Sequence, residues 1–177
     1  MNNLREILLS EMSRRNIDFV VEIVQNNPQL FDELFEMVIQ NTEPLSRGAI
    51  WALDHCAEKE PKLMLPKIQK LIEAFPNFKH DGLKRHSLRI LRNYEIPEEK
   101  IIVMIDLCFG LLHSPKESIA VKVHAMDILY RLSEKEPGLK PELAAAIEFQ
   151  LHEASAGLKN HSEKLLKKIY KEEDRDS

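Results

Sequence analysis

The sequence predicts an all-α protein built from stacked helix pairs, and three observations support this class. Residues 82–94 (GLKRHSLRILRNY) return in altered form at residues 120–130 and 157–167, so the copies begin about 38 residues apart, a period typical of repeated helical pairs. Residues 57–63 (AEKEPKL) return as SEKEPGL at residues 133–139, at twice that spacing. No stretch shows the β-branched alternation between turn residues that marks a strand. We therefore expect about four helix pairs, preceded by a capping pair.

Residues 1–27 are expected to form the N-terminal capping helix pair. Their apolar residues recur with the helical period. They are Leu4, Ile7, Leu8 and Met12 in the first helix, and Phe19, Val20, Ile23 and Val24 in the second. Asn26-Asn27-Pro28 then ends one helix and starts the next, because proline fits a first helical turn, where its missing N–H is not needed.

Four repeats follow the cap and complete a single domain over residues 1–171. Their boundaries are residues 28–60, 61–96, 97–136 and 137–171. Each repeat is a pair of helices, most of them opened by a proline. The pairs are Pro28–Asn41 with Pro44–Glu60, Pro61–Phe75 with Asp81–Tyr94, Pro97–His113 with Pro115–Glu136, and Pro137–Ser155 with Gly157–Lys171. Residues 172–177 are all polar, which predicts a frayed tail.

The period and helix layout of residues 28–171 resemble those of HEAT-like α-solenoids. The resemblance implies a right-handed α-solenoid in which the second helix of each pair lines a concave groove. The chain also resembles a group of short bacterial HEAT-like proteins that are often labelled adenylosuccinate lyase. We do not expect lyase chemistry here, because true lyases are more than twice as long and use a flexible Ser/Met/Pro/Lys/Asn signature loop that this sequence lacks.

Composition and charge narrow the classes of function. Apolar residues make up 44% of the chain and charged residues 31%, which is ordinary for a globular protein. The formal net charge of −4 argues against a dedicated nucleic-acid binder, because phosphate contacts need a basic surface. The two cysteines, Cys56 and Cys108, form no CxxC pair and indicate a reduced, cytoplasmic protein. No apolar run is long enough to span a bilayer, so no membrane association is expected.

Helical periodicity divides each second helix into a core face and an opposite face. The core-face residues are mostly apolar or small: Leu45, Ala49, Ala52, Leu53 and Cys56; Leu83, Ser87, Ile90, Leu91 and Tyr94; Val121, Ala125, Ile128, Leu129 and Leu132; and Leu158, Ser162, Leu165, Leu166 and Ile169. The resemblance places the opposite face in the groove, where like-numbered residues of different repeats would form rows. The candidate binding residues on it are Arg47, Ile50, Trp51, Asp54, Arg85, Leu88, Arg89, Arg92, Met126, Asp127, Tyr130, Lys164 and Lys167.

Aromatic residues, Met and Arg together are typical of the centre of a binding site. The alternative is that Ile50, Leu88 and Met126 pack against the neighbouring second helix. The same choice applies to the arginine stripe of the second repeat, Arg85, Arg89 and Arg92, which lie at i, i+4 and i+7. These arginines can grip phosphate or carboxylate groups, or they can pair with Asp54 and Asp127 on flanking helices. Mutual repulsion of three like charges favours a ligand.

His86, His124 and His161 share one repeat register, which suggests a metal site. Equivalent positions in stacked helices lie about 10 Å apart, whereas zinc ligands converge at about 2 Å from the ion. We therefore expect these histidines to hydrogen-bond an adjacent helix, and we expect no metal and no other cofactor.

The leading hypothesis is a non-enzymatic scaffold that binds a protein or peptide in the groove. Its arginines would bind acidic groups, and its apolar anchors would be Trp51, Leu88, Met126 and Tyr130. No Gly-rich phosphate loop, GxSxG or HExxH motif is present, so the sequence does not favour an enzyme.

Two alternatives stay open. In the first, the chain binds nucleic acid or a damaged base, because Trp51, Asp54, Arg89 and Arg92 resemble in kind the concave-face residues of the DNA alkylation repair family, HEAT-like glycosylases; Asp54 would then be the acid/base. In the second, a homo-oligomer hides the groove in a subunit interface.

Overall fold

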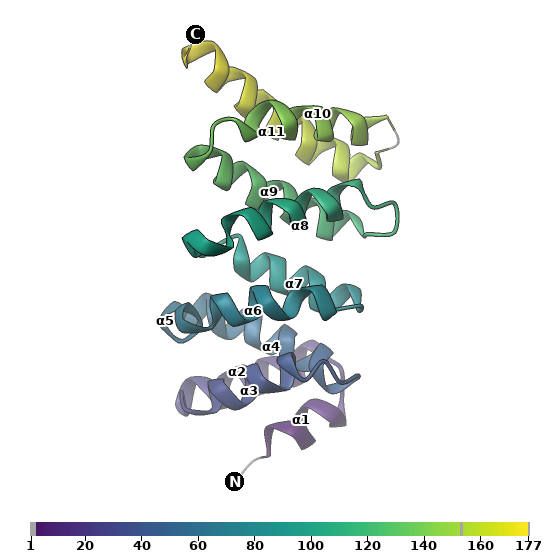
Figure 1. Ribbon diagram of the computed structural model, residues 1–177. Helices are drawn as coiled ribbons and strands as arrows, with labels where there is room; N and C mark the ends of the chain where they lie inside the picture. Colours follow the sequence, from purple (N-terminus) through teal and green to yellow (C-terminus); the bar gives the residue numbers. More distant parts are fainter. Residues whose placement is uncertain (1–2, 153, 177) are drawn as a thin grey trace. The chain divides into compact units, whose positions relative to one another are not determined.

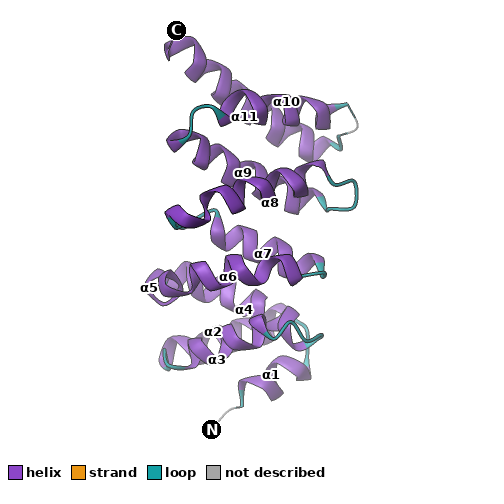
Figure 2. Cartoon of the chain, in the orientation of Figure 1, coloured by secondary structure: helices purple, strands orange, loops and turns teal. Residues whose placement is uncertain are grey.

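The computed structural model describes residues 3–152 and 154–176, and every regular element in them is a helix (Figure 2). The all-α prediction is therefore confirmed. The chain forms two compact units, Met1–Pro97 and Glu98–Ser177, and the second unit begins one residue after the predicted start of the third repeat. We predicted a single domain and a right-handed stack, and both stay predictions.

The first unit is organised around α4 (Figure 1). Its α-helices are α1 (Leu4–Ser10), α2 (Arg14–Asn26), α3 (Leu30–Ile39), α4 (Leu45–Lys59), α5 (Pro61–Met64), α6 (Ile68–Ala74) and α7 (Asp81–Leu91). Helix α4 packs against its pair partner α3, and also against α1, α2 and α7. Because α4 has neighbours on several sides, it supplies much of the core of this unit.

The second unit is also built from helices that pack in pairs. It contains α8 (Ile101–His113), α9 (Ile119–Lys135), α10 (Leu139–Leu151) and α11 (Ala156–Asp176). Helix α8 packs on α9, and α10 packs on both α11 and α9. Helix α11 continues to Asp176, so it includes residues for which the sequence predicted a frayed tail; Ser177 lies outside the described residues.

Polar caps explain where several helices begin. Ser13 accepts a hydrogen bond from the backbone N–H of Asn16 at the start of α2, and Ser118 accepts one from Val121 at the start of α9. Each bond satisfies a backbone donor that has no partner within the helix. At the start of α7, Nδ1 of His80 accepts from the Gly82 N–H at 3.0 Å.

The helix predicted over Pro61–Phe75 is interrupted in the structure. Helix α5 ends at Met64, a 3₁₀ turn covers Leu65–Lys67, and α6 begins at Ile68. Pro66 explains the interruption, because proline has no N–H to donate and its ring clashes with the carbonyl four residues earlier.

Every residue predicted for the core faces of the second helices is buried. The least buried members of the four sets, Tyr94 and Leu166, are each 8% exposed. Burial of each large apolar side chain stabilises the fold by about 1.5–3 kcal/mol. The helical periodicity therefore located the core correctly.

The expectation that Ile50, Leu88 and Met126 line an open surface is wrong. All three are completely buried, and they occupy one repeat register at intervals of 38 residues. Met126 on α9 accepts a hydrogen bond from the Ser162 hydroxyl on α11 at 3.8 Å, so it packs against the next second helix. These residues are core because a second helix is covered by its own partner and by a neighbouring second helix as well.

Candidate binding site on helices α4 and α7

Helices α4 and α7 run parallel as neighbours, and their facing side chains meet in order along the chain. The Trp51 ring stacks on the His86 ring, with centroids 6.3 Å apart. One turn further along, Asp54 meets Arg89. Near the ends of both helices, the Tyr94 hydroxyl donates to the Ala57 carbonyl at 2.9 Å. The parallel alignment brings three predicted site residues, Trp51, Asp54 and Arg89, together between the two helices.

Asp54 is the centre of the polar contacts between the two helices. Its side chain is 2% exposed, and its Oδ2 accepts hydrogen bonds from Nδ1 of His86 at 2.7 Å and from Nη1 of Arg89 at 2.8 Å. Two donors, one of them a guanidinium, compensate the carboxylate for its removal from water. Arg89 also bonds the Glu58 carboxylate through Nη2.

Further contacts join Glu58 back to Trp51, so that the interacting side chains form a closed ring. Trp51 Nε1 donates to Nε2 of His55 at 3.2 Å, and Nδ1 of His55 lies 3.3 Å from Oε2 of Glu58. Tryptophan can only donate, so Nε2 of His55 must be unprotonated and its Nδ1 must carry the proton given to Glu58. We call this arrangement the α4–α7 polar ring; its members are Trp51, His55, Glu58, Arg89, Asp54 and His86.

The polar ring changes the roles predicted for two residues. Arg89 was expected to meet a ligand, but its guanidinium is already bonded to Asp54 and Glu58. Asp54, the acid/base of the damaged-base alternative, is buried and accepts from two donors. The pairing of the arginine stripe with Asp54, which the sequence left open, is thus confirmed for Arg89. Arg92 is partly exposed.

Arg47 and Arg85 behave differently from Arg89. Arg85 is exposed and has no polar partner among the described residues. Nη1 of Arg47 lies 3.4 Å from Nε2 of His80. Nδ1 of His80 accepts from a backbone N–H, and an imidazole that accepts at Nδ1 carries its ring proton on Nε2 and offers no lone pair there to the guanidinium. Neither arginine has a carboxylate partner among the described residues. Trp51, one turn after Arg47 in α4, is partly exposed.

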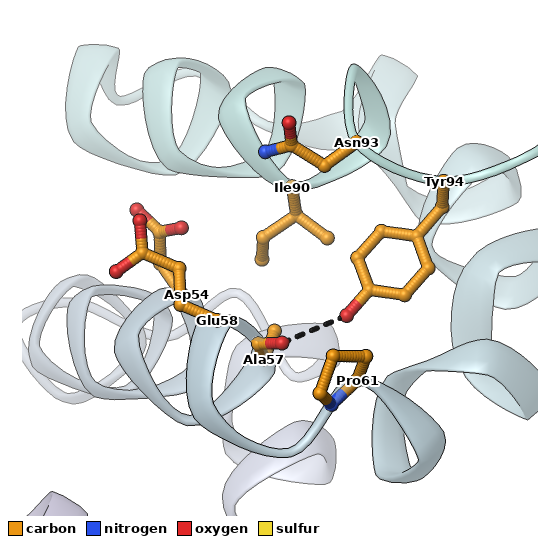
Figure 3. A pocket seen from close by; sticks show the side chains of 7 residues that line it. All are labelled: Asp54, Ala57, Glu58, Pro61, Ile90, Asn93 and Tyr94. Atoms are coloured by element: carbon orange, nitrogen blue, oxygen red, sulfur yellow. Dashed lines mark hydrogen bonds between the residues drawn. The ribbon is translucent and has the colours of Figure 1, made fainter.

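A pocket opens beside the polar ring, where α7 ends (Figure 3). It has a volume of about 330 Å³, and its walls are Asp54, Ala57, Glu58, Pro61, Ile90, Asn93 and Tyr94. Asn93 turns its amide Nδ2 to the Arg89 carbonyl at 2.9 Å. We call this cavity the Asp54–Tyr94 pocket.

Sequence reasoning missed part of this pocket. It assigned Ile90 and Tyr94 to the core face and gave Asn93 no role. Asn93 lies two residues after Leu91, the last residue of α7, and this position is the signal that could have identified it. A helix end leaves room that a continuing helix would fill. Burial, followed by the nearby Asp54 carboxylate, raises the pKa of Tyr94.

In the second unit the remaining predicted residues form separate contacts. Asp127 on α9 accepts from Nε2 of His161 on α11 at 2.8 Å, and Tyr130 donates to Glu172. Lys164 and Lys167 are exposed. The expectation that the repeat-register histidines bond an adjacent helix is confirmed for His86 and His161. Continuation of the predicted rows from α7 to α9 stays a prediction.

No three His, Cys, Asp or Glu side chains among the described residues are grouped so that they could hold a metal ion. None of the described helices has the length and apolar character needed to cross a membrane.

Paired helices that recur at about 38 residues and bond through equivalent histidines define a helical repeat protein. The sequence model of the HEAT repeat domain family matches residues 4–169, and the chain belongs to this family. No curated protein and no solved structure matches the chain at a significant level. HEAT repeats generally serve as protein-interaction scaffolds. The family match supports neither the lyase label nor a specific relation to DNA alkylation repair proteins.

Proposed function

We propose that this protein is a non-enzymatic, cytoplasmic scaffold that binds a segment of a protein partner on the exposed face of α4 and α7. The observation that carries this proposal is that the guanidinium groups of Arg47 and Arg85 have no carboxylate partner among the described residues, while Trp51, one turn after Arg47 in α4, is partly exposed. Repeat proteins of this kind generally bind partners on extended surfaces.

The chemistry of these three side chains favours an acidic segment. Two guanidinium groups can each form paired hydrogen bonds with a carboxylate. An indole adds a large apolar contact area, and Trp and Arg are the residues most enriched among interface residues that dominate binding energy. We therefore expect the partner segment to carry acidic and apolar residues close together.

The state of Asp54 argues against a hydrolytic role for this face. A general acid or base must reach the reacting atoms of a substrate. Asp54 is instead buried and engaged by His86 and Arg89. Its place in the polar ring supports a structural role, that of fixing the spacing of α4 and α7.

A peptide-display selection on the full chain tests the proposal. Peptides that bind should be enriched in Asp or Glu next to an apolar residue, and their binding should change the fluorescence of Trp51, the single tryptophan. The double variant Arg47→Ala/Arg85→Ala should weaken binding about tenfold or more, since each lost charged contact costs about 1 kcal/mol.

The matched control removes two other exposed arginines, Arg5 on α1 and Arg15 on α2. The variant Arg5→Ala/Arg15→Ala has the same net charge as the test variant and should bind with wild-type affinity. Selected peptides without acidic residues, or equal losses in both double variants, would refute the proposal.

A further inference from the structure

The Asp54–Tyr94 pocket has an acidic end and an apolar remainder (Figure 3). The carboxylates of Asp54 and Glu58 project at one end, and Ile90, Pro61 and the Tyr94 ring lie along the rest. Its volume of about 330 Å³ is at the small end of the range for ligand pockets, so it suits a single side chain. An apolar passage with a carboxylate end complements an alkyl stem with a cationic tip.

Among the described residues, the pocket wall carries two carboxylates and no cationic side chain. Asp54 and Glu58 line it, and Arg89 is the cation bonded to both of them. The two carboxylates exceed the single guanidinium by one negative charge. A bound cation would balance that charge without displacing Arg89.

The negative field extends across the pocket. The Asp54 carboxylate contributes, after burial, to raising the pKa of Tyr94, whose ring lies across the pocket from the carboxylates with its hydroxyl directed to Ala57 (Figure 3). A positive charge between these groups is attracted by the same field, and the attraction is stronger in a partly enclosed pocket than in bulk water.

We propose that the Asp54–Tyr94 pocket receives a lysine or arginine side chain of the partner segment. This inference rests on the proposed function and adds a second, oppositely charged contact to it. The face of α4 and α7 is then bipolar: Arg47 and Arg85 bind acidic groups at the N-terminal ends of the two helices, and the pocket binds a basic group at their C-terminal ends.

The bipolar arrangement predicts a spacing in the partner. Glu58 follows Arg47 by 11 positions in α4, which is a distance of about 16 Å at ~1.5 Å per residue. An extended peptide advances about 3.3 Å per residue. The basic residue of the segment should therefore lie about five residues from the acidic residue.

The first test uses n-butylammonium, which reproduces a lysine side chain, and 1-butanol as its neutral counterpart. Each is titrated into the full chain while the methyl resonances of Ile90 are followed by NMR. At mildly alkaline pH, where free imidazoles are neutral, n-butylammonium should shift the Ile90 signal saturably, with an affinity about fivefold or more above that of 1-butanol.

The variant Glu58→Gln removes the uncompensated charge while keeping the shape of the side chain. Glu58 is 45% exposed, so this variant should fold, and it should bind n-butylammonium about fivefold more weakly than the wild type. The control Glu60→Gln changes the net charge equally but lies outside the pocket wall, and it should behave as the wild type. Equal binding of n-butylammonium by all three proteins would overturn the inference.

The second test separates this inference from the proposed function. In peptides selected on the full chain, replacing the basic residue by norleucine should weaken binding to the wild type but not to Glu58→Gln. If acidic peptides bind through Arg47 and Arg85 and this replacement has no effect, the pocket inference is refuted while the proposed function stands. If n-butylammonium binds but selected peptides lack a basic residue, the pocket serves a small amine and the assignment to a partner side chain is refuted. If no peptide binds at all, the proposed function fails first.

Discussion

The Asp54 carboxylate on α4 and the His86 imidazole on α7 lie 2.7 Å apart, and the contact has a counterpart in the second unit. There, Asp127 on α9 bonds His161 on α11 at 2.8 Å. The two histidines share a repeat register, but the two aspartates do not. At the offset of 76 residues that relates α4 to α9, Asp127 corresponds to Trp51 and not to Asp54. The ring nitrogen that makes the bond also differs, Nδ1 in one pair and Nε2 in the other. The bond between successive second helices is therefore retained although the aspartate has moved by nearly one turn.

Removing the Asp54 carboxylate should destabilise the first unit strongly. The variant Asp54→Ala leaves the donors of His86 and Arg89 without their acceptor, in a site where Asp54 is 2% exposed and Arg89 30%. Loss of a buried charged partner costs about 3–5 kcal/mol, and the partial exposure of Arg89 reduces this to about 2–3 kcal/mol. Urea denaturation followed by Trp51 fluorescence measures the loss.

The control for this variant is Asp32→Ala. Asp32 also forms an ion pair, with Lys67 at 2.7 Å, but its side chain is 72% exposed. An exposed pair contributes about 0–1 kcal/mol. Similar losses for the two variants would contradict the structural role assigned to Asp54.

The repeat architecture and the core faces could be predicted from the sequence, because both depend on periodicity. Each residue assigned to a core face, from Leu45 to Ile169, is buried. The interruption at Pro66 could also have been predicted, since a proline inside a helix removes one of its hydrogen bonds.

The candidate site could be predicted only in part. Periodicity places Ile50 and Leu88 opposite the core face, but their burial depends on how closely α7 approaches α4, which local sequence does not encode. The same distance decides whether Arg89 meets a ligand or Asp54. The sequence is consistent with both a ligand contact and an Asp54 contact for Arg89, and only the three-dimensional packing distinguishes them.

Truncation of Leu88 tests the corrected assignment of its helix face. Leu88 is completely buried, so Leu88→Ala should lower the free energy of unfolding by about 2–5 kcal/mol through lost burial and an added cavity. Arg85→Ala, three residues earlier on the exposed side of α7, should change it by about 0.5 kcal/mol or less. A mild effect of Leu88→Ala in thermal or urea unfolding would restore Leu88 as a surface anchor.

The two cysteine thiols should be unreactive in the folded protein. Burial raises the pKa of Cys56 to about 12, and burial raises the pKa of Cys108 as well. The thiolate is the reactive species, so at about pH 8 a disulfide reagent such as DTNB should label them only through unfolding. The labelling rate should equal the unfolding rate and rise in parallel with added urea. Rapid stoichiometric labelling of the native protein would show that one of these thiols is accessible.

Tyr130 on α9 and Glu172 on α11 should make the stability of the second unit depend on pH at both extremes. Their hydrogen bond, followed by burial, raises the pKa of Tyr130 to about 12. The same bond, and then the one from Lys140, lowers the pKa of Glu172. A raised tyrosine pKa gives stability that is full below the ordinary value of 10 and is lost as the pH rises through about 12. A lowered glutamate pKa gives stability that is full above the ordinary value of 4.5 and is lost as the pH falls.

The bond between Tyr130 and Glu172 should therefore stabilise the packing of α11 on α9 most between about pH 5 and pH 10. The measurement is the difference in urea midpoint between the wild type and Tyr130→Phe at a series of pH values. Since the phenylalanine variant lacks the hydroxyl, effects of other titrating groups cancel in this difference. The difference should be constant across the middle of the range and shrink at both ends, because protonation of Glu172 removes the acceptor and ionisation of Tyr130 removes the donor. A difference that stayed constant into acid and alkali would mean that ring packing, and not the hydrogen bond, is what Tyr130 contributes.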